Sequence, residues 1–161
     1  MKSISILYLL CAAILFSCGS PETAAIDQRS YNLGVIGGFS EVVGLGIKKL
    51  ALSSPMIPDE MDGLIDDAEQ IAERNSVKLF REKDFLVTDL FPEDVCEGKD
   101  VLLIYKDTVL EEYNALKNRK KQLLESGKYT GEDRKAIAVE FGKLLSYPDE
   151  KIEELLKDNE R

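Results

Sequence analysis

Residues 31–55, with the sequence YNLGVIGGFSEVVGLGIKKLALSSP, constrain the fold of this chain more than any other stretch. Their first half places apolar side chains on one broad helical face, formed by Leu33, Val35, Ile36, Phe39, Val42 and Val43. Within that helix, Gly37 and Gly38 each lower the helix propensity by about 1 kcal/mol relative to alanine. We expect another backbone to pack closely against these two glycines and offset the cost. Gly44 then ends the helix as its C-cap, and residues 50–52 follow as a short buried strand.

The middle of the chain alternates between helical and strand patterns. Residues 58–75 begin with Pro-Asp-Glu and carry an apolar stripe at helical spacing, formed by Met61, Leu64, Ile65, Ala68, Ile71 and Ala72. Residues 77–82 alternate in polarity and are predicted as a strand, and residues 85–91 are predicted as another, with a tight hairpin at residues 83–84 between them. Residues 101–105, VLLIY, are apolar throughout, which is typical of a strand covered on both faces.

The last third of the chain shows helical patterns, separated by breaks at residues 127–131 and 147–148. The sequence therefore predicts a single α/β domain in two or three layers, with a small mixed sheet of about four strands and a helical C-terminal third. One helix separates the strands predicted at residues 49–53 and 77–81. We therefore expect these two strands to be parallel neighbours in a right-handed β-α-β unit.

Residues 1–17 have the pattern of a secretory signal peptide, with a short positive start and an apolar run too short to span a bilayer with ease. The segment Leu15-Phe16-Ser17-Cys18 resembles the lipobox of bacterial lipoproteins, in which an aliphatic residue and then a small one precede an invariant cysteine. This resemblance implies that Cys18 is acylated and becomes the mature N-terminus. Residues 18–29 are then a flexible tether, and residues 30–161 form the folded domain. The alternatives are an ordinary cleaved signal and an uncleaved anchor helix.

The lipobox resemblance also implies a location. It places the protein in the bacterial cell envelope, anchored to a membrane through its lipid. Gly19 stands where lipoproteins retained in the inner membrane carry Asp, so the expected location in a two-membrane cell is the outer membrane, facing the periplasm. Each buried acyl methylene contributes about 0.8 kcal/mol, so several acyl chains together hold such a protein almost permanently.

Composition excludes several classes of protein. The chain has a net charge of -9 and no long basic cluster, which argues against nucleic-acid binding. It has no histidine, which removes Ser-His-Asp catalysis, Cys-His catalysis and His-bound zinc. Cys11 lies in the signal peptide and Cys18 would carry lipid, so Cys96 is alone and no intrachain disulfide is expected. We find no nucleotide-binding loop or EF-hand pattern, and we expect neither a cofactor nor a metal.

Polar residues follow the predicted parallel strands and suggest a binding site. Ser53 and Ser54 end one strand, and Arg81 and Glu82 end the next. In open α/β sheets, ligands usually bind beyond the carboxyl ends of parallel strands, so these four residues are candidates for binding a small polar molecule. The alternative is that they satisfy nearby backbone groups and each other, as polar loop residues usually do.

Three carboxylates stand in apolar surroundings, at Glu41, Glu82 and Asp89. A carboxylate pair in a cleft can perform acid–base or glycosidase chemistry, and Ser53 with a lysine such as Lys49 offers a second catalytic arrangement. The alternative is structural. In that case Glu41 pairs with Lys48 or Lys49, Glu82 pairs with Arg81 or Lys83, and Asp89 caps a turn.

Two functional classes follow from these observations. We favour a membrane-anchored envelope lipoprotein that acts as a small binding or interaction module, with a small polar molecule or another protein as its partner. The alternative is a small envelope hydrolase that uses carboxylates or a Ser/Lys pair. Binding is favoured because the sequence contains no recognisable catalytic motif.

Overall fold

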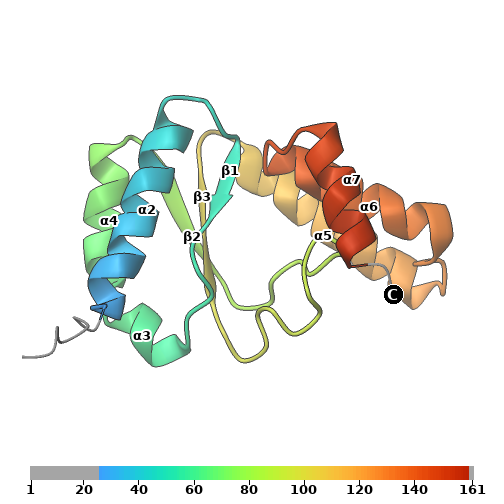
Figure 1. The fold of residues 1–161 in the computed structure, drawn as a ribbon, viewed down its shortest axis with the longest axis horizontal. Coiled ribbons are helices and arrows are strands. Elements are labelled where there is room, and N and C mark those ends of the chain that lie inside the picture. The colour runs from blue at the N-terminus through green and yellow to red at the C-terminus, as the bar shows by residue number, and fades with distance from the viewer. Residues whose placement is uncertain (1–25, 160–161) are drawn as a thin grey trace, which may run out of the picture.

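The computed structural model describes residues 26–159 of the 161-residue chain. In chain order, its elements are α2 (Gln28–Gly44), β1 (Leu50–Leu52), α3 (Pro58–Asp62), α4 (Ile65–Arg74), β2 (Lys78–Glu82), β3 (Val101–Tyr105), α5 (Val109–Glu125), α6 (Gly131–Leu144) and α7 (Asp149–Asp158) (Figure 1). The predicted signal peptide, Cys18 and most of the predicted tether lie outside the described residues. Among residues 26–159, no helix is long and apolar enough to cross a membrane.

The sheet has three strands in the order β1-β3-β2, and both outer strands are antiparallel to β3. Leu50 of β1 and Lys78 of β2 both lie opposite Tyr105. The α/β class is confirmed, but the prediction of a mixed sheet of about four strands is wrong. So is the prediction that β1 and β2 are neighbours. They run in the same direction, but β3 lies between them, so the helices that join β1 to β2 bridge a gap of one strand.

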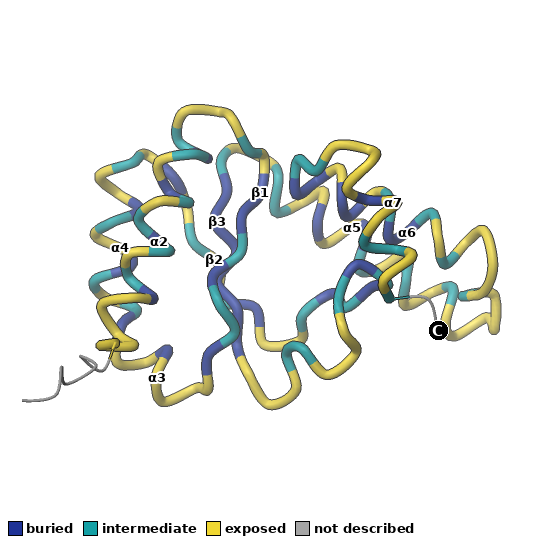
Figure 2. Tube along the Cα trace, viewed as in Figure 1, coloured by how far each residue is buried: buried dark blue, intermediate teal, exposed yellow. Residues whose placement is uncertain are grey.

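Apolar side chains cover both faces of the sheet. Figure 2 colours β1 and β3 mostly as buried, with α2 and α4 to one side of the sheet and α5, α6 and α7 to the other. Leu102 and Ile104 of β3 join the core formed with α2 and α4, whereas Leu103 and Tyr105 join the core formed with α5, α6 and α7. Successive side chains of a strand point to opposite faces, which explains this division. All five residues of β3 are buried, so the prediction of a strand covered on both faces is confirmed.

Residues 85–91 form an irregular loop, so the predicted fourth strand and its hairpin are wrong. Burial in this segment nevertheless alternates as it would in a strand, because Leu86, Thr88 and Leu90 are buried and the residues between them are half-buried. Side chains replace the partner strand. The Leu86 N–H donates to the Tyr113 hydroxyl at 3.0 Å, and the Leu90 N–H donates to the Thr88 hydroxyl at 3.4 Å.

Two glycines mark where helices make close contacts. A Cβ on Gly44, the last residue of α2, would lie 2.6 Å from the carbonyl oxygen of Asn75, which follows α4. A Cβ on Gly142 in α6 would lie 2.7 Å from the Ile152 side chain of α7. The expectation of close backbone packing at Gly37 and Gly38 is wrong. The nearest contact of Gly37 would be 4.0 Å, and Gly38 has open space around it.

Candidate functional site

Ser53 completes the hydrogen bonding between β1 and β3. Its N–H donates to the Leu102 carbonyl at 3.0 Å, and its hydroxyl accepts a hydrogen bond from the Leu102 N–H at 2.9 Å. The same hydroxyl donates to the Ser54 carbonyl at 2.9 Å. Ser53 is 6% exposed, so its hydroxyl serves buried backbone groups.

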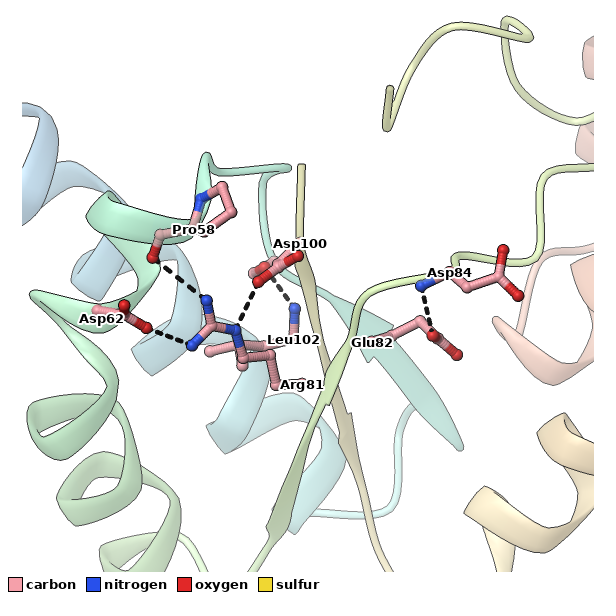
Figure 3. A network of polar contacts seen from close by, with 8 residues as sticks. Pro58, Asp62, Arg81, Glu82, Asp84, Asp100 and Leu102 are labelled. Atoms are coloured by element: carbon pink, nitrogen blue, oxygen red, sulfur yellow. Dashed lines mark hydrogen bonds and ion pairs between the residues drawn. The ribbon is translucent and has the colours of Figure 1, made fainter. Parts of the chain in front are cut away.

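Arg81 connects β2 to α3 and to the start of β3 (Figure 3). Its Nε donates to Asp100 at 2.6 Å, Nη1 donates to Asp62, and Nη2 donates to the Pro58 carbonyl at 3.2 Å. The hydrogen bond to Asp62, followed by that to Asp100, raises the pKa of the Arg81 guanidinium. Protein acceptors thus occupy all three nitrogens of this side chain.

Glu82 lies on the opposite side of the sheet from Arg81, because the two residues are consecutive in β2 (Figure 3). Its carboxylate accepts hydrogen bonds from the Asp84 N–H at 2.8 Å and from Lys117 of α5 at 3.1 Å. The Tyr113 hydroxyl lies beside it, and burial, reinforced by Glu82, raises the pKa of Tyr113. The structure therefore does not bring Glu82 together with Ser53 and Arg81.

The remaining predicted site residues occupy other positions. Glu41 is exposed on α2, and Ser54 is half-buried after β1. Lys48, a predicted partner of Glu41, instead donates to the Leu145 carbonyl at 2.5 Å. The three carboxylates of the hydrolase hypothesis thus lie on α2, on β2 and in the 85–91 loop, and they do not share one cluster of contacts.

Asp89 belongs to an ion pair that the sequence analysis did not predict. Arg134 of α6 donates to it from two nitrogens, with Nε 2.7 Å from Oδ2 and Nη2 bonded to Oδ1. This hydrogen bonding raises the pKa of Arg134. The Arg134 guanidinium lies 5.8 Å from the centre of the Tyr129 ring, and the Lys120 ammonium lies 5.2 Å from it. Lys120 also donates to the Val87 carbonyl at 2.6 Å, which fixes the loop to α5.

The Asp89–Arg134 pair forms part of a cavity of about 600 Å³, which we call the Asp89 cavity. It is open to solvent on one side and is bordered by the 85–91 loop, the connection before α6 with the start of α6, and one face of α7. Its lining consists of Asp89, Tyr129, Thr130, Gly131, Arg134, Lys135, Glu153, Leu156 and Lys157. Asp89 is the only one of the six predicted binding residues in this lining.

The charges of this lining fall into two groups. In the first group, the negative charge of Asp89 neutralises the positive charge of Arg134, and the carboxylate of Glu93 also interacts electrostatically with Arg134 and Lys120. Lys135, Glu153 and Lys157 take part in none of the ion pairs found among residues 26–159. No sequence motif marks these residues, because Lys135 lies on α6 while Glu153 and Lys157 lie on α7, and they converge only through the packing of α6 against α7.

Two other hollows carry less defined chemistry. One, of about 360 Å³, lies between α5 and α6 and is bordered by the exposed Arg119–Glu140 ion pair. The other, of about 400 Å³, includes Cys96 among acidic residues. Burial raises the pKa of the Cys96 thiol, and Lys99 opposes this shift. Within the described part of the chain, no cluster of carboxylates and cysteines has the arrangement of a metal site.

Comparison of the chain with protein-family models, curated proteins and solved structures gives no match.

Proposed function

We propose that this protein is a lipid-anchored envelope protein whose folded domain binds a small polar molecule in the Asp89 cavity. The lipobox-like segment ending at Cys18 supports the anchor and an outer-membrane location facing the periplasm. The cavity itself is the observation that carries the binding proposal. Its volume of about 600 Å³ lies within the range of small-molecule sites, roughly 300–1,000 Å³.

The lining of the cavity supports binding in two ways. The double hydrogen bond from Arg134 to Asp89 and the contact of Lys120 with Val87 hold the loop and helices in place before a ligand arrives. A site organised in advance loses less entropy when it binds. The lining also combines charged groups with the partly apolar side chains of Tyr129 and Leu156, which is typical of pockets for small polar molecules.

A fragment screen by NMR tests this proposal. Protein purified from cells expressing the full-length chain is labelled with ¹⁵N and titrated with small acids, amines, amides and sugars. We expect at least one class to shift the amide signals of Thr130, Gly131 and Leu156, because these residues line the cavity. Signals of exposed residues on α2, such as Glu41, provide the internal control. If no compound shifts the cavity signals, or if the shifts map to another surface, the Asp89 cavity is not a ligand site.

The anchor is tested separately by Cys18→Ala. We expect this variant to lose incorporation of radiolabelled palmitate and to leave the membrane fraction, because the resemblance makes Cys18 the acylated residue. Cys11→Ala is the matched control, since Cys11 lies within the apolar run of the signal peptide and should not change labelling. Unchanged labelling of the Cys18→Ala protein would refute the lipoprotein proposal.

A further inference from the structure

The unpaired charges of the Asp89 cavity restrict what it can bind. Arg134 is balanced by Asp89 within the protein. Of the other charged side chains in the lining, Lys135 and Lys157 are positive and Glu153 is negative. Two lysines against one glutamate leave one net positive charge. This local excess contrasts with the net charge of -9 on the whole chain.

Distance explains why the local charge matters more than the total. At physiological ionic strength, interactions between exposed charges are largely screened beyond about 8 Å. Glu132 and Asp133 lie close by in the first turn of α6, but neither contributes to the lining. A ligand inside the cavity therefore meets Lys135 and Lys157 at shorter range than most of the acidic surface.

The size of the excess favours one kind of anion. A carboxylate carries one negative charge at neutral pH, which one net positive charge balances. A phosphate monoester carries about -1.5 to -2 and would leave unbalanced negative charge beside Glu153 and Asp89. The cavity also has an apolar part, because Tyr129 and Leu156 are partly buried side chains packed against the core.

Resting on the proposed function, we infer that the ligand of the Asp89 cavity is an organic acid with one carboxylate and an apolar body. Lys135 and Lys157 hold the carboxylate, and the apolar body lies against Leu156 and Tyr129. The Asp89–Arg134 pair borders the cavity and positions the Tyr129 ring. It does not need to contact the ligand.

Matched compounds test the charge and the body of the ligand independently. Compounds with a phenyl, indole or hexyl group are each prepared in three forms, with a carboxylate, a neutral amide or an amine. Phenyl phosphate is added to the set. Affinities for the purified protein are measured by NMR titration at low and at physiological salt. We expect the carboxylates to bind at least about tenfold more tightly than their amides, a difference of about 1.4 kcal/mol, and the amines not to bind. We expect the affinity of the carboxylates to fall as salt increases.

Two charge reversals and a control assign the effect to the cavity. Lys135→Glu and Lys157→Glu should each weaken carboxylate binding by about tenfold or more. Lys128→Glu is the control, because Lys128 is exposed on the connection between α5 and α6 and lies outside the lining. Its affinity should equal that of the wild type. Thermal unfolding of each variant verifies that the exposed substitutions leave the fold intact, and Lys135→Gln offers a milder change.

Three results would overturn the inference, and they differ in their meaning for the proposed function. Equal or tighter binding of the amides, amines or phenyl phosphate in the cavity would refute the organic acid while leaving a binding site there. Carboxylate binding unaffected by both charge reversals would refute the role of Lys135 and Lys157. If no compound of this set and none in the fragment screen binds, the proposed function fails and the inference fails with it.

Discussion

At the scale of single residues, Ser53 shows how a candidate ligand group becomes a structural one. The sequence places a serine after a short strand, where a hydroxyl is as able to bind a ligand as to satisfy the backbone. The structure has it bonded to both the Leu102 N–H and the Ser54 carbonyl, at 2.9 Å each. No sequence pattern distinguishes these outcomes, because Leu102 lies 49 positions away along the chain.

The role of Ser53 leads to a stability prediction. Ser53→Ala leaves the N–H of Leu102 without its acceptor, and Leu102 is 0% exposed. We expect the free energy of unfolding to fall by roughly 1–3 kcal/mol, the cost of an unsatisfied buried donor. Ser54→Ala is the control and should change stability by less than about 0.5 kcal/mol, because Ser53 uses only the backbone carbonyl of Ser54. Urea unfolding followed by circular dichroism measures both values, and equal stabilities would contradict the assigned role.

Arg81 gives the second prediction at this scale. Arg81→Ala leaves the carboxylate of Asp100 buried, with only 7% of its side chain exposed, and without its partner. Breaking a buried pair costs roughly 3–5 kcal/mol, and we expect the lower end because the Arg81 side chain is 22% exposed. Asp62→Ala should cost less than about 1 kcal/mol, since the Asp62 side chain is 64% exposed.

Chemical denaturation of the two variants tests the structural role of Arg81. If Arg81→Ala is as stable as the wild type and instead loses stabilisation by an added acid, Arg81 is a ligand-binding residue. That outcome would agree with the ligand-binding role that the sequence predicts for Arg81 and would contradict its structural role.

At the scale of elements, the 85–91 loop shows why a strand predicted from the sequence can stay irregular. Its residues are buried alternately, as in a strand, at Leu86, Thr88 and Leu90. The sequence does not show whether a neighbouring strand is available to accept the backbone hydrogen bonds. Here Tyr113 and Lys120 of α5 bond to that backbone, so the segment stays irregular and brings Asp89 to Arg134. The same tertiary contacts create the candidate cavity, which is why sequence reasoning found one of its lining residues and missed the others.

The glycines of α2 give a prediction at the scale of elements. Gly44→Ala would place a Cβ 2.6 Å from the backbone oxygen of Asn75, so α2 or the end of α4 must move. We expect a loss of roughly 1–3 kcal/mol, as for other overpacked sites. Gly38→Ala is the matched control in the same helix, where nothing lies within 4 Å of the added Cβ. It should stabilise the protein by roughly 0.5–1 kcal/mol through helix propensity. Calorimetric melting temperatures should therefore move in opposite directions, and a shared direction would contradict this packing of α2.

At the scale of the whole molecule, β3 determines the architecture. Its apolar run correctly predicts a strand buried on both faces, but the order of strands does not follow from the sequence. The usual preference for neighbouring strands that are adjacent in sequence favours β1 beside β2. In this chain β3 comes last of the three strands in the sequence but lies between the other two, so it supplies side chains to both cores. The polar residues predicted to share one rim also separate for a local reason, because Arg81 and Glu82 are consecutive in β2 and point to opposite faces of the sheet.

This central position of β3 predicts that the two cores unfold together. Ile104 contributes to the core with α2 and α4, whereas Tyr113 lies in the core with α5, α6 and α7. Ile104→Ala removes apolar volume on the first side and should cost roughly 2–5 kcal/mol. If β3 couples the cores, hydrogen exchange should become faster in peptides from both α6 and α2. The opening free energy calculated from exchange should fall by the same amount in the two helices. Leu103→Ala, on the opposite face of the same strand, is the reciprocal variant and should affect α2 as much as α6. Exchange that accelerates only on the mutated side in both variants would show instead that the two cores open independently.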